Sequence, residues 1–485
     1  MSLAATPART FIALTLTVGG FTTLQSLLVP VLSEIQSELR TTPAGVTWTL
    51  TAWFLTAAVA TPLLGRIGDM FGKRRMLLLA TVAVAAGSLT AVLAPTIEVL
   101  LLARVIQGLG GAIYPLAFGI VRDTFPAARV PGRIGILSAI IAVASGLGIV
   151  LAGPLSDILG WRGLFLVPLA LVAIGGVLTV LFVPESVSRS GGRVNIPAAL
   201  LLGGWLVALL LPLSNGAEWG WSSPAVIALF AAAAVLLVAW IVVELRSRQP
   251  LIDVRMMRAS TVWTTNAAGL FIGATMYGVF SFFPGFVQAP PSSGFGFGAS
   301  VSESGLLMLP MLAMMAVGGF LNGPLSKIIS LRTQFASSSA LIGLATISIA
   351  LVHTAAWQVS IAAGVFGVGL GLAVAAMPSL IMQGVPASQT GVATGMNANF
   401  RTIGSAVGTS LMAAIIAGSV TGSGAPTEAG YSAGFLTLAA LAAGAAGIAL
   451  LGHLRRHPVA LLNTGSTATV PGTVRETRLD GNLAA

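Results

Sequence analysis

Long runs of apolar residues recur along the whole chain, with short polar or Gly-rich connections between them. A helix needs roughly 20 apolar residues to cross the hydrocarbon core of a bilayer, and these runs have about that length. They lie near residues 11–32, 46–64, 76–94, 98–119, 134–155, 163–183, 196–213, 224–243, 263–288, 304–325, 335–352, 357–378, 392–417 and 432–452. The pattern predicts an all-α polytopic membrane protein of about 14 transmembrane helices. An even number of spans places both termini on one side.

The basic residues indicate which side that is. The connections that follow the even-numbered spans, together with the two termini, hold most of the 24 Lys and Arg residues. Arg40 and Arg162 fall in the other connections, and Arg104 and Arg401 fall inside spans. Because Lys and Arg accumulate in cytoplasmic loops, we expect a multi-pass protein of the cell membrane with both termini in the cytoplasm.

The composition agrees with a lipid environment and removes several other classes of protein. The chain is 56% hydrophobic and 8% charged, whereas a soluble domain carries about 25% charged residues. The formal charge of +10 is dispersed among short loops, so it does not indicate nucleic-acid binding. There is no Cys and no phosphate-binding G-x-x-x-x-G-K-[ST] loop, and the three His residues suggest no cluster. We therefore expect no enzyme activity, metal or cofactor. The first apolar run is interpreted as a retained helix, because no clear signal-peptide cleavage site follows it.

The stretch Gly65–Met76 is polar and charged, and it lies between two long apolar runs. It fills every specified position of the pattern G-x-[LI]-x-D-x-x-G-[RK]-[RK], and it closely resembles the signature loop between the second and third spans of the major facilitator superfamily of transporters. An ordinary basic loop would explain the basic residues, but not the acid or the Gly spacing. The resemblance implies a gating loop that consists of Gly65, Asp69, Gly72, Lys73, Arg74 and Arg75.

A second, altered copy of this loop follows the tenth span. Gly323–Arg332 echoes the signature, but Lys327 stands at the place of Asp69 and Ser330 at the place of Gly72. Such repeats are common in secondary transporters, so we predict two six-helix pseudo-repeats with two extra helices between them. The expected division is an N-terminal half at 1–185, an insertion at 186–260, a C-terminal half at 261–452, and a disordered cytoplasmic tail at 453–485.

The gating loop has an expected partner at the start of span 13. That span begins near Gly391 on the same side of the membrane as Asp69, and a helix N-terminus offers unpaired N–H donors with about half a positive charge. Asp69 could dock there and hold the two halves together on the cytoplasmic side. The resemblance implies such a latch, and the alternative is a loop that acts only in topology.

Arg104 lies about 9 Å deep in span 4, where a charge needs a wet cavity or a partner. With Gln107 it forms R-x-x-Q-G, which resembles the second motif of the superfamily and implies a role in proton coupling. The alternative is a structural Arg that pairs with a polar group of span 1.

In span 5, Gly148, Gly153 and Pro154 predict a kinked, closely packed helix. They match in part the motif G-x-x-x-G-P-x-x-G-G of superfamily antiporters, with Asp157 and Ile158 in place of the last two Gly residues. Simple helix packing is the alternative.

Span 13 carries Arg401 at a depth of about 15 Å, and Asn397 lies four residues earlier on the same predicted face. This stretch, Ser302–Pro310 and the two extra helices resemble the fourteen-span drug:proton antiporter family over nearly the whole chain. Many members have an Asp in span 1, but the corresponding segment here contains Gln25 and no acid. That departure leaves the proton-carrying residue and any preference for cations open. We expect Gln25, Asn397 and Arg401 to line a substrate cavity, although core packing would explain Gln25 equally well.

The expected function is secondary active transport, in which protons drive the export of small amphiphilic compounds by alternating access. One alternative is a proton-coupled exporter of a specific metabolite, with an anion as one candidate because Arg104 and Arg401 are the deep charges. Another is a membrane sensor or scaffold that transports nothing. The expected partners are a small-molecule substrate, protons and the lipid bilayer. The sequence leaves the oligomeric state open and is compatible with a monomer.

Overall fold

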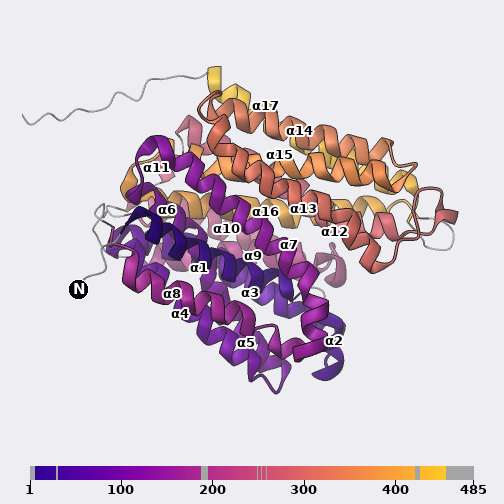
Figure 1. Ribbon diagram of the computed structural model, residues 1–485, viewed down its shortest axis with the longest axis horizontal. Helices are drawn as coiled ribbons and strands as arrows, with labels where there is room; N and C mark the ends of the chain where they lie inside the picture. Colours follow the sequence, from indigo (N-terminus) through magenta and orange to yellow (C-terminus); the bar gives the residue numbers. More distant parts are fainter. Residues whose placement is uncertain are drawn as a thin grey trace, which may run out of the picture.

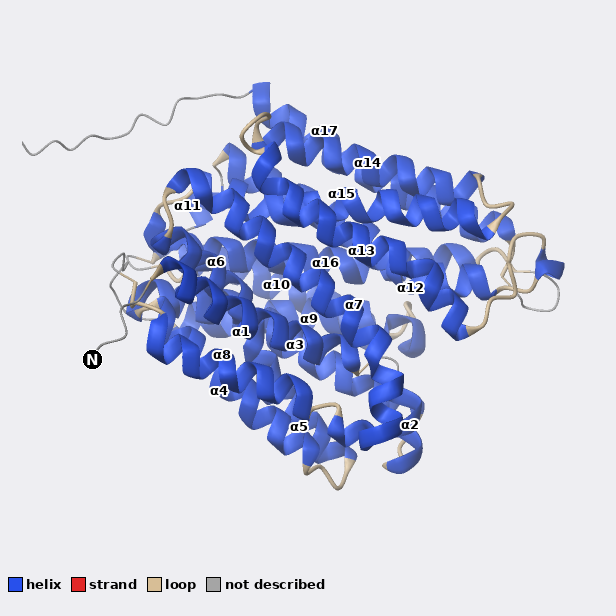
Figure 2. Ribbon diagram, in the orientation of Figure 1, coloured by secondary structure: helices blue, strands red, loops and turns tan. Residues whose placement is uncertain are grey.

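The computed structural model describes residues 6–28, 31–186, 195–247, 250–252, 254–257, 259–420 and 426–454. This part of the chain is helical throughout (Figure 2), with one isolated β-bridge between Val420 and Pro426. Thirteen of the described helices are long and apolar enough to cross a membrane, and one bent helix pair adds a fourteenth crossing. The prediction of a polytopic helical protein with about fourteen spans is therefore confirmed.

The N-terminal half contains eight α-helices within the described residues. They are α1 (Pro7–Leu27), α2 (Leu32–Glu38), α3 (Pro43–Phe71), α4 (Lys73–Val92), α5 (Ile97–Gly108), α6 (Ile113–Thr124), α7 (Val130–Gly163) and α8 (Leu166–Phe182). The short 3-10 helix η2 (Leu109–Ala112) joins α5 to α6, so the predicted fourth span is one crossing made of three segments.

The insertion contributes α9 (Ile196–Trp219) and α10 (Pro224–Arg246), and the short α11 (Val254–Met257) follows α10. The C-terminal half contains α12 (Ser260–Gln288), α13 (Val301–Leu325), α14 (Leu331–Leu351), α15 (Ala356–Gln383), α16 (Thr390–Ala417) and α17 (Glu428–Leu454). The 3-10 helix η5 (Ala387–Gln389) precedes α16. The predicted tail lies outside the described residues beyond Leu454.

Local capping explains where several of these helices begin. Thr42 accepts a hydrogen bond from the backbone N–H of Gly45 at 3.0 Å, and Pro43 occupies the first turn of α3. Ser223 accepts from Val226 at 3.3 Å in the same way, ahead of Pro224 at the start of α10. A side-chain cap satisfies an orphan donor, and a Pro in the first turn removes another.

The fifth and sixth spans differ from the predicted boundaries. Residues Leu151–Gly163 of α7 and the whole of α8 meet at a bend of 77°. Within α7 the backbone leaves helical dihedrals at Gly160, where φ is +66°, a value that Gly adopts without steric strain. Pro154 stays inside α7, six residues before that break.

The two halves pack side by side, and each has its own apolar core. In Figure 1, α1, α4, α5 and α8 form one side of the bundle, and α12, α14, α15 and α17 form the other. Helices of opposite halves meet along two seams, α3 with α16 and α7 with α13. The insertion packs its own cluster, which includes Trp205 and Trp240, against Val392 and Met396 of α16. The first described residue of α1 and the last of α17 lie at the same end of the bundle (Figure 1).

Candidate functional site

Asp69 joins the two halves at one end of the bundle, which is called the latch end from here on. Its carboxylate accepts two backbone hydrogen bonds from the start of α16, from Gly391 at 3.1 Å and from Val392 at 3.0 Å. The side chain of Asp69 is fully buried. A helix N-terminus presents N–H groups and a partial positive charge, so a carboxylate is well matched to this position. Asp69 and these two N–H groups are termed the Asp69 latch.

Glycine allows the helices to approach closely at the latch. A Cβ atom on Gly65 would lie 2.6 Å from the carbonyl oxygen of Gly391, and one on Gly391 would lie 2.6 Å from the carbonyl oxygen of Gly65. Real Cβ atoms do not come that close to backbone oxygen, so both positions require Gly unless the helices separate. This contact sets α3 near enough to α16 for Asp69 to reach the N–H groups.

The basic part of the loop is anchored inside its own half. Lys73 is buried with its ammonium 3.5 Å from Asp69 Oδ1 and 2.9 Å from Asp123 Oδ2 at the end of α6. Gly72 has φ +121°, which ends α3 and turns the chain into α4. Arg74 N–H donates to Glu185 Oε1 at 3.2 Å.

Arg75 lies 3.6 Å from the second oxygen of Glu185, with its side chain largely exposed. An exposed ion pair contributes little to stability. The loop is therefore tied to α6 and to the segment after α8 chiefly through Lys73 and the Arg74 backbone.

Arg122 forms a second link between the halves that the sequence did not reveal. Its guanidinium donates to Thr390 Oγ1 at 2.7 Å and to the Val385 carbonyl at 2.9 Å, next to the Asp69 latch. In the sequence Arg122 counted only as one of several basic loop residues, because nothing in its spacing marks a partner more than 250 residues away. The structure therefore adds Arg122 to the latch end.

The insertion is also attached at the latch end. Arg66, directly after Gly65 of the gating loop, donates to the Pro250 carbonyl at 3.3 Å. The buried Glu244 of α10 accepts from the backbone N–H of Ile252 at 3.1 Å. The segment after α10 thus lies against the gating loop. The sequence gave no sign of this contact, since Glu244 lies near the end of an apolar run without a motif.

Arg104 is buried in the N-terminal half, where it has partners on two helices and an aromatic ring. Its Nε donates to the Thr49 carbonyl of α3 at 3.0 Å, its Nη1 to Gln107 Oε1 at 2.7 Å, and its guanidinium lies 5.6 Å from the Trp53 ring. Gln107 in turn donates to Ser88 at 3.2 Å. These hydrogen bonds run to α3 and α4, not to the first span as the structural alternative supposed. Proton coupling through Arg104 and Gln107 stays a prediction.

Of the predicted kink residues in α7, Gly148 packs against Ser26 of α1, where a Cβ atom would overlap the Ser side chain. A Cβ on Gly153 would meet nothing within 4 Å. Close packing therefore explains Gly148 but not Gly153. A kink at Gly148, Gly153 and Pro154 stays a prediction, and the break that the structure has is at Gly160.

A cavity of about 190 Å³ lies between the two halves. The N-terminal half lines it from α1, α3, α6 and α7, and the C-terminal half lines it from α12, α13, α15 and α16. Six aromatic side chains are in the wall, namely Trp53, Phe54, Tyr114, Phe118, Tyr277 and Phe280. Neither α9 nor α10 contributes to the described lining. The described residues of these two helices thus lie outside the cavity wall.

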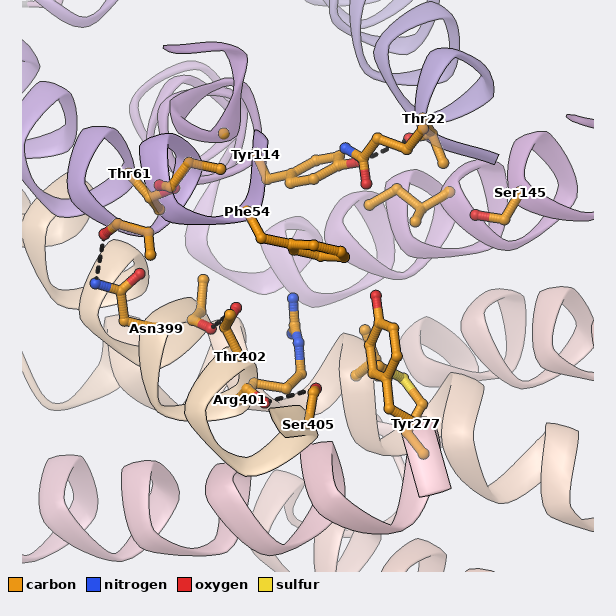
Figure 3. Close-up of a pocket in the computed structure, with 18 of the residues that line it drawn as sticks. Thr22, Phe54, Thr61, Tyr114, Ser145, Tyr277, Asn399, Arg401, Thr402 and Ser405 are labelled. Carbon is orange, nitrogen blue, oxygen red and sulfur yellow. Dashed lines mark hydrogen bonds between the residues drawn. The ribbon is translucent and has the colours of Figure 1, made fainter. Parts of the chain in front are cut away.

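Gln25 and Arg401 lie in the cavity wall, and Asn397 does not. Gln25 donates to the Tyr114 hydroxyl at 3.1 Å, and Tyr114 also shares a hydrogen bond of 2.9 Å with Thr22. In Figure 3 the Arg401 side chain points from α16 into the cavity, beside the Tyr277 ring and toward Phe54.

The placement of Asn397 in the cavity is corrected by its contacts. Asn397 is buried against α12, where it donates to Asn266 Oδ1 at 3.0 Å. The residues of α16 in the wall are Ala398, Asn399, Arg401, Thr402 and Ser405. Successive residues of an α-helix are about 100° apart around its axis. On that scale the middle of the cavity-lining set lies about 60–80° from Arg401, on the side opposite to Asn397. Arg401 is thus at one edge of the cavity face, and Asn397 lies beyond that edge.

A bundle of two helical halves, with a cavity between them and polar contacts that close one end, has the architecture of a secondary transporter. The family model of the Major Facilitator Superfamily matches residues 11–409. The chain therefore belongs to the Major Facilitator Superfamily, and it is a multi-pass membrane protein. The resemblance seen in the gating loop is confirmed.

Similar proteins include several named for drug resistance. The multidrug transporter protein MdtP of Bacillus subtilis is 26% identical over 76% of this chain and 68% of its own length. The multidrug resistance protein Stp of Mycobacterium tuberculosis is 29% identical over 80% and 72%. The methylenomycin A resistance protein of Streptomyces coelicolor is 29% identical over 78% and 79%.

Among solved structures, the human organic anion transporter MFSD10 (TETRAN) superposes with a TM-score of 0.63 and covers 92% of this chain and 99% of its own. It is 17% identical in sequence, so the likeness concerns the fold.

Proposed function

We propose that the protein exports small amphiphilic compounds across the cell membrane in exchange for protons, by alternating access. The central observation is the cavity, with six aromatic side chains in its wall, between two halves that polar contacts hold together at the latch end. If these contacts open and close, the cavity faces each side in turn. The names of the relatives MdtP and Stp support drug export. In this proposal the latch end and both termini face the cytoplasm, as the distribution of basic residues predicts.

Proton exchange would supply enough energy for uphill export. One charge that moves through 100 mV yields about 2.3 kcal/mol, so one inward proton at about 150 mV yields roughly 3.5 kcal/mol and supports a gradient of roughly several hundred-fold. The proposed coupling residues are Arg104 and Gln107. Trp53 supports this role because its ring lies next to Arg104 and also lines the cavity.

The test is transport into everted membrane vesicles, with ethidium, 2-naphthoate and 2-naphthamide as probes. At least one probe should accumulate, and a protonophore should abolish its accumulation. Ala398→Trp, which fills the cavity, should remove uptake, whereas the matched Ala414→Trp, on an exposed face of the same helix, should retain it. Arg104→Ala should lose proton-driven uptake while part of the probe binding remains. Absence of uphill uptake for all three probes would refute the proposal and favour a sensor or scaffold.

A further inference from the structure

The central cavity holds a charge that nothing in its described wall balances. Arg401 is the one charged residue among the described residues that line it. Within the described part of the chain, no hydrogen bond or ion pair of the Arg401 guanidinium is found. The side chain is half-buried and points into the cavity (Figure 3). The cavity is therefore electropositive on its C-terminal side.

Two other Arg residues, the buried Arg104 and the half-buried Arg122, have partners within the chain. The Arg104 guanidinium has a carbonyl, an amide oxygen and a Trp ring as partners. The Arg122 guanidinium donates to a Thr hydroxyl and to backbone carbonyls. A charge inside a membrane protein is costly unless it is paired or hydrated. Arg401 is thus the interior Arg that is arranged to receive a partner from outside the chain.

The opposite wall of the cavity does not offer that partner. The polar groups of Thr22, Gln25 and Tyr114 are joined to one another by hydrogen bonds of 2.9 and 3.1 Å. A carboxylate, by contrast, can accept two parallel hydrogen bonds from a guanidinium, and such pairs are among the strongest in proteins. An anionic ligand would neutralise Arg401 and satisfy its donors at the same time.

The rest of the cavity wall indicates what kind of molecule would carry the anionic group. Six aromatic rings, together with Met276 and Met315, surround the space next to Arg401. Aromatic rings pack well against other rings in offset or edge-on geometry. The volume of the cavity is about 190 Å³. It is below the roughly 300–1,000 Å³ of pockets for drug-sized ligands, so this conformation fits a compact ligand.

We propose that the cavity binds small organic anions, in which a carboxylate or phenolate pairs with Arg401 and an aromatic ring packs against the aromatic wall. This inference concerns the same cavity as the proposed function and names the class of substrate. It reverses the preference for cations that an acid in the first span would give. Export of an anion would also draw directly on the membrane potential, which favours it by about 50-fold per 100 mV.

The test compares binding of three probes of the same shape and different charge. The full-length protein in lipid nanodiscs is titrated calorimetrically with 2-naphthoate, 2-naphthamide and 2-naphthylmethylammonium. We expect 2-naphthoate to bind at least about tenfold more tightly than the amide, and the ammonium to bind most weakly. Arg401→Gln should remove the preference for the acid over the amide. The matched control Arg246→Gln, which changes an exposed Arg at the end of α10, should keep it.

A chemical charge series at one position guards against a variant that fails to fold. The chain has no Cys, so Arg401→Cys provides a single thiol that methanethiosulfonates can convert to an ammonium, a sulfonate or a neutral side chain. We expect the ammonium adduct to restore preference for 2-naphthoate and the sulfonate adduct to favour the cationic probe. Equal affinities across the three adducts, or no probe binding to the wild type, would overturn the proposal.

The binding site for anions and the proposed export can be refuted independently of each other. If 2-naphthoate binds through Arg401 but no probe moves uphill in everted vesicles, the assignment of an anion site stands and the proposed export fails. If ethidium is exported in a proton-dependent manner while 2-naphthoate neither binds nor moves, export stands and the anion site is wrong.

Discussion

At each of the two seams between the halves, two Gly residues bring the helices close together. The polar side chain beside that contact differs between the seams. At the α3–α16 seam, Gly65 and Gly391 approach each other closely. At the α7–α13 seam Gly323 and Gly132 do the same, and a Cβ on Gly323 would lie 2.6 Å from Gly132 Cα. The first seam is then joined by the buried carboxylate of Asp69. The second is joined by the neutral amide of Asn322, which donates to the Pro131 carbonyl at 2.7 Å.

The starts of the two facing helices explain this difference. The first turn of α16 has free N–H groups at Gly391 and Val392, and these suit a carboxylate. The first turn of α7 contains Pro131, which has no N–H to donate. A side chain that meets this turn does better as a donor to a carbonyl. Asn322 supplies that donor, and its own oxygen accepts from the buried Gln334 at 2.5 Å.

From this contrast we infer that the two seams have different roles. The charged seam has a neutral hydrogen bond from Asn399 to the Ala58 carbonyl at 2.7 Å and, in addition, a carboxylate whose two hydrogen bonds can be lost in a single step. The neutral seam is held by an ordinary hydrogen bond from Asn322. Hydrogen bonds to charged groups contribute about 1.5–3 kcal/mol and neutral ones about 0.5–1.5 kcal/mol. The charged seam is therefore the stronger candidate for the gate.

The largest effect is expected for Asp69→Asn. The amide keeps one acceptor oxygen and loses the charge, so at least one charge-assisted hydrogen bond of about 1.5–3 kcal/mol disappears. The balance should shift about tenfold or more toward an open latch end. The measurement is the rate at which Cys introduced at Thr61, in the cavity wall of the same helix, reacts with a membrane-impermeant thiol reagent in everted vesicles.

The matched control is Asp157→Asn, which makes the same chemical change at an exposed position of α7. It should leave the labelling rate within about twofold, because an exposed carboxylate contributes little. An Asp69→Asn variant with wild-type labelling and wild-type transport would show that the Asp69 latch does not govern access to the cavity.

The Asp69 contact could be predicted from the sequence because it depends on the membrane topology. The apolar runs and the basic residues placed the end of span 2 and the start of span 13 on one side, and a helix start attracts a carboxylate whatever its sequence. The number of spans followed from run length for the same reason. No detail of packing was needed for either prediction.

The rotation of α16 about its own axis could not be predicted from the sequence. Arg401 and Asn397 are about 40° apart on the helix, and only the neighbours decide which of them faces the cavity. Gly404 and Gly408 bring α16 against the backbone of Leu270 and Ala274 in α12, and this contact turns Asn397 away from the cavity. Gly residues are frequent in the spans, so the sequence does not show which helix packs against these two.

The aromatic wall was missed for a related reason. Tyr114 and Tyr277 come from α6 and α12, which are far apart in the chain, and each looks like one more ring in an apolar run. Their importance lies in facing the same space as Arg401. Such convergence is a property of the tertiary structure and leaves no local pattern.

A smaller effect is expected for Asn322→Ala at the second seam. The variant removes the hydrogen bond to Pro131 and leaves the buried Gln334 amide without its Asn322 partner. A neutral hydrogen bond contributes about 0.5–1.5 kcal/mol, so labelling of Cys at Thr61 should change by about 2- to 10-fold. The same comparison of labelling rates measures it, with thermal unfolding as a check on folding. A shift larger than that of Asp69→Asn would reverse the order of the two seams.

The smallest effect is expected from restoring the Asp and the Gly of the signature in the second loop, with the double variant Lys327→Asp and Ser330→Gly. Asp69 lies inside α3, which continues to Phe71, so the helix itself aims the carboxylate at α16. By contrast, α13 ends at Leu325, and Lys327 lies beyond the helix end with an exposed side chain.

An Asp at 327 would therefore remain in solvent. The first turn of α7 also lacks a full set of donors for a carboxylate, because Pro131 has no N–H. We expect the double variant to change labelling of Cys at Thr61 and the transport rate by less than about twofold, since exposed charges interact weakly. A shift of about tenfold would mean that the second seam can accept a carboxylate after all. In that case the residues of the motif, rather than the length of α3 and the free N–H groups of α16, would determine where the latch forms.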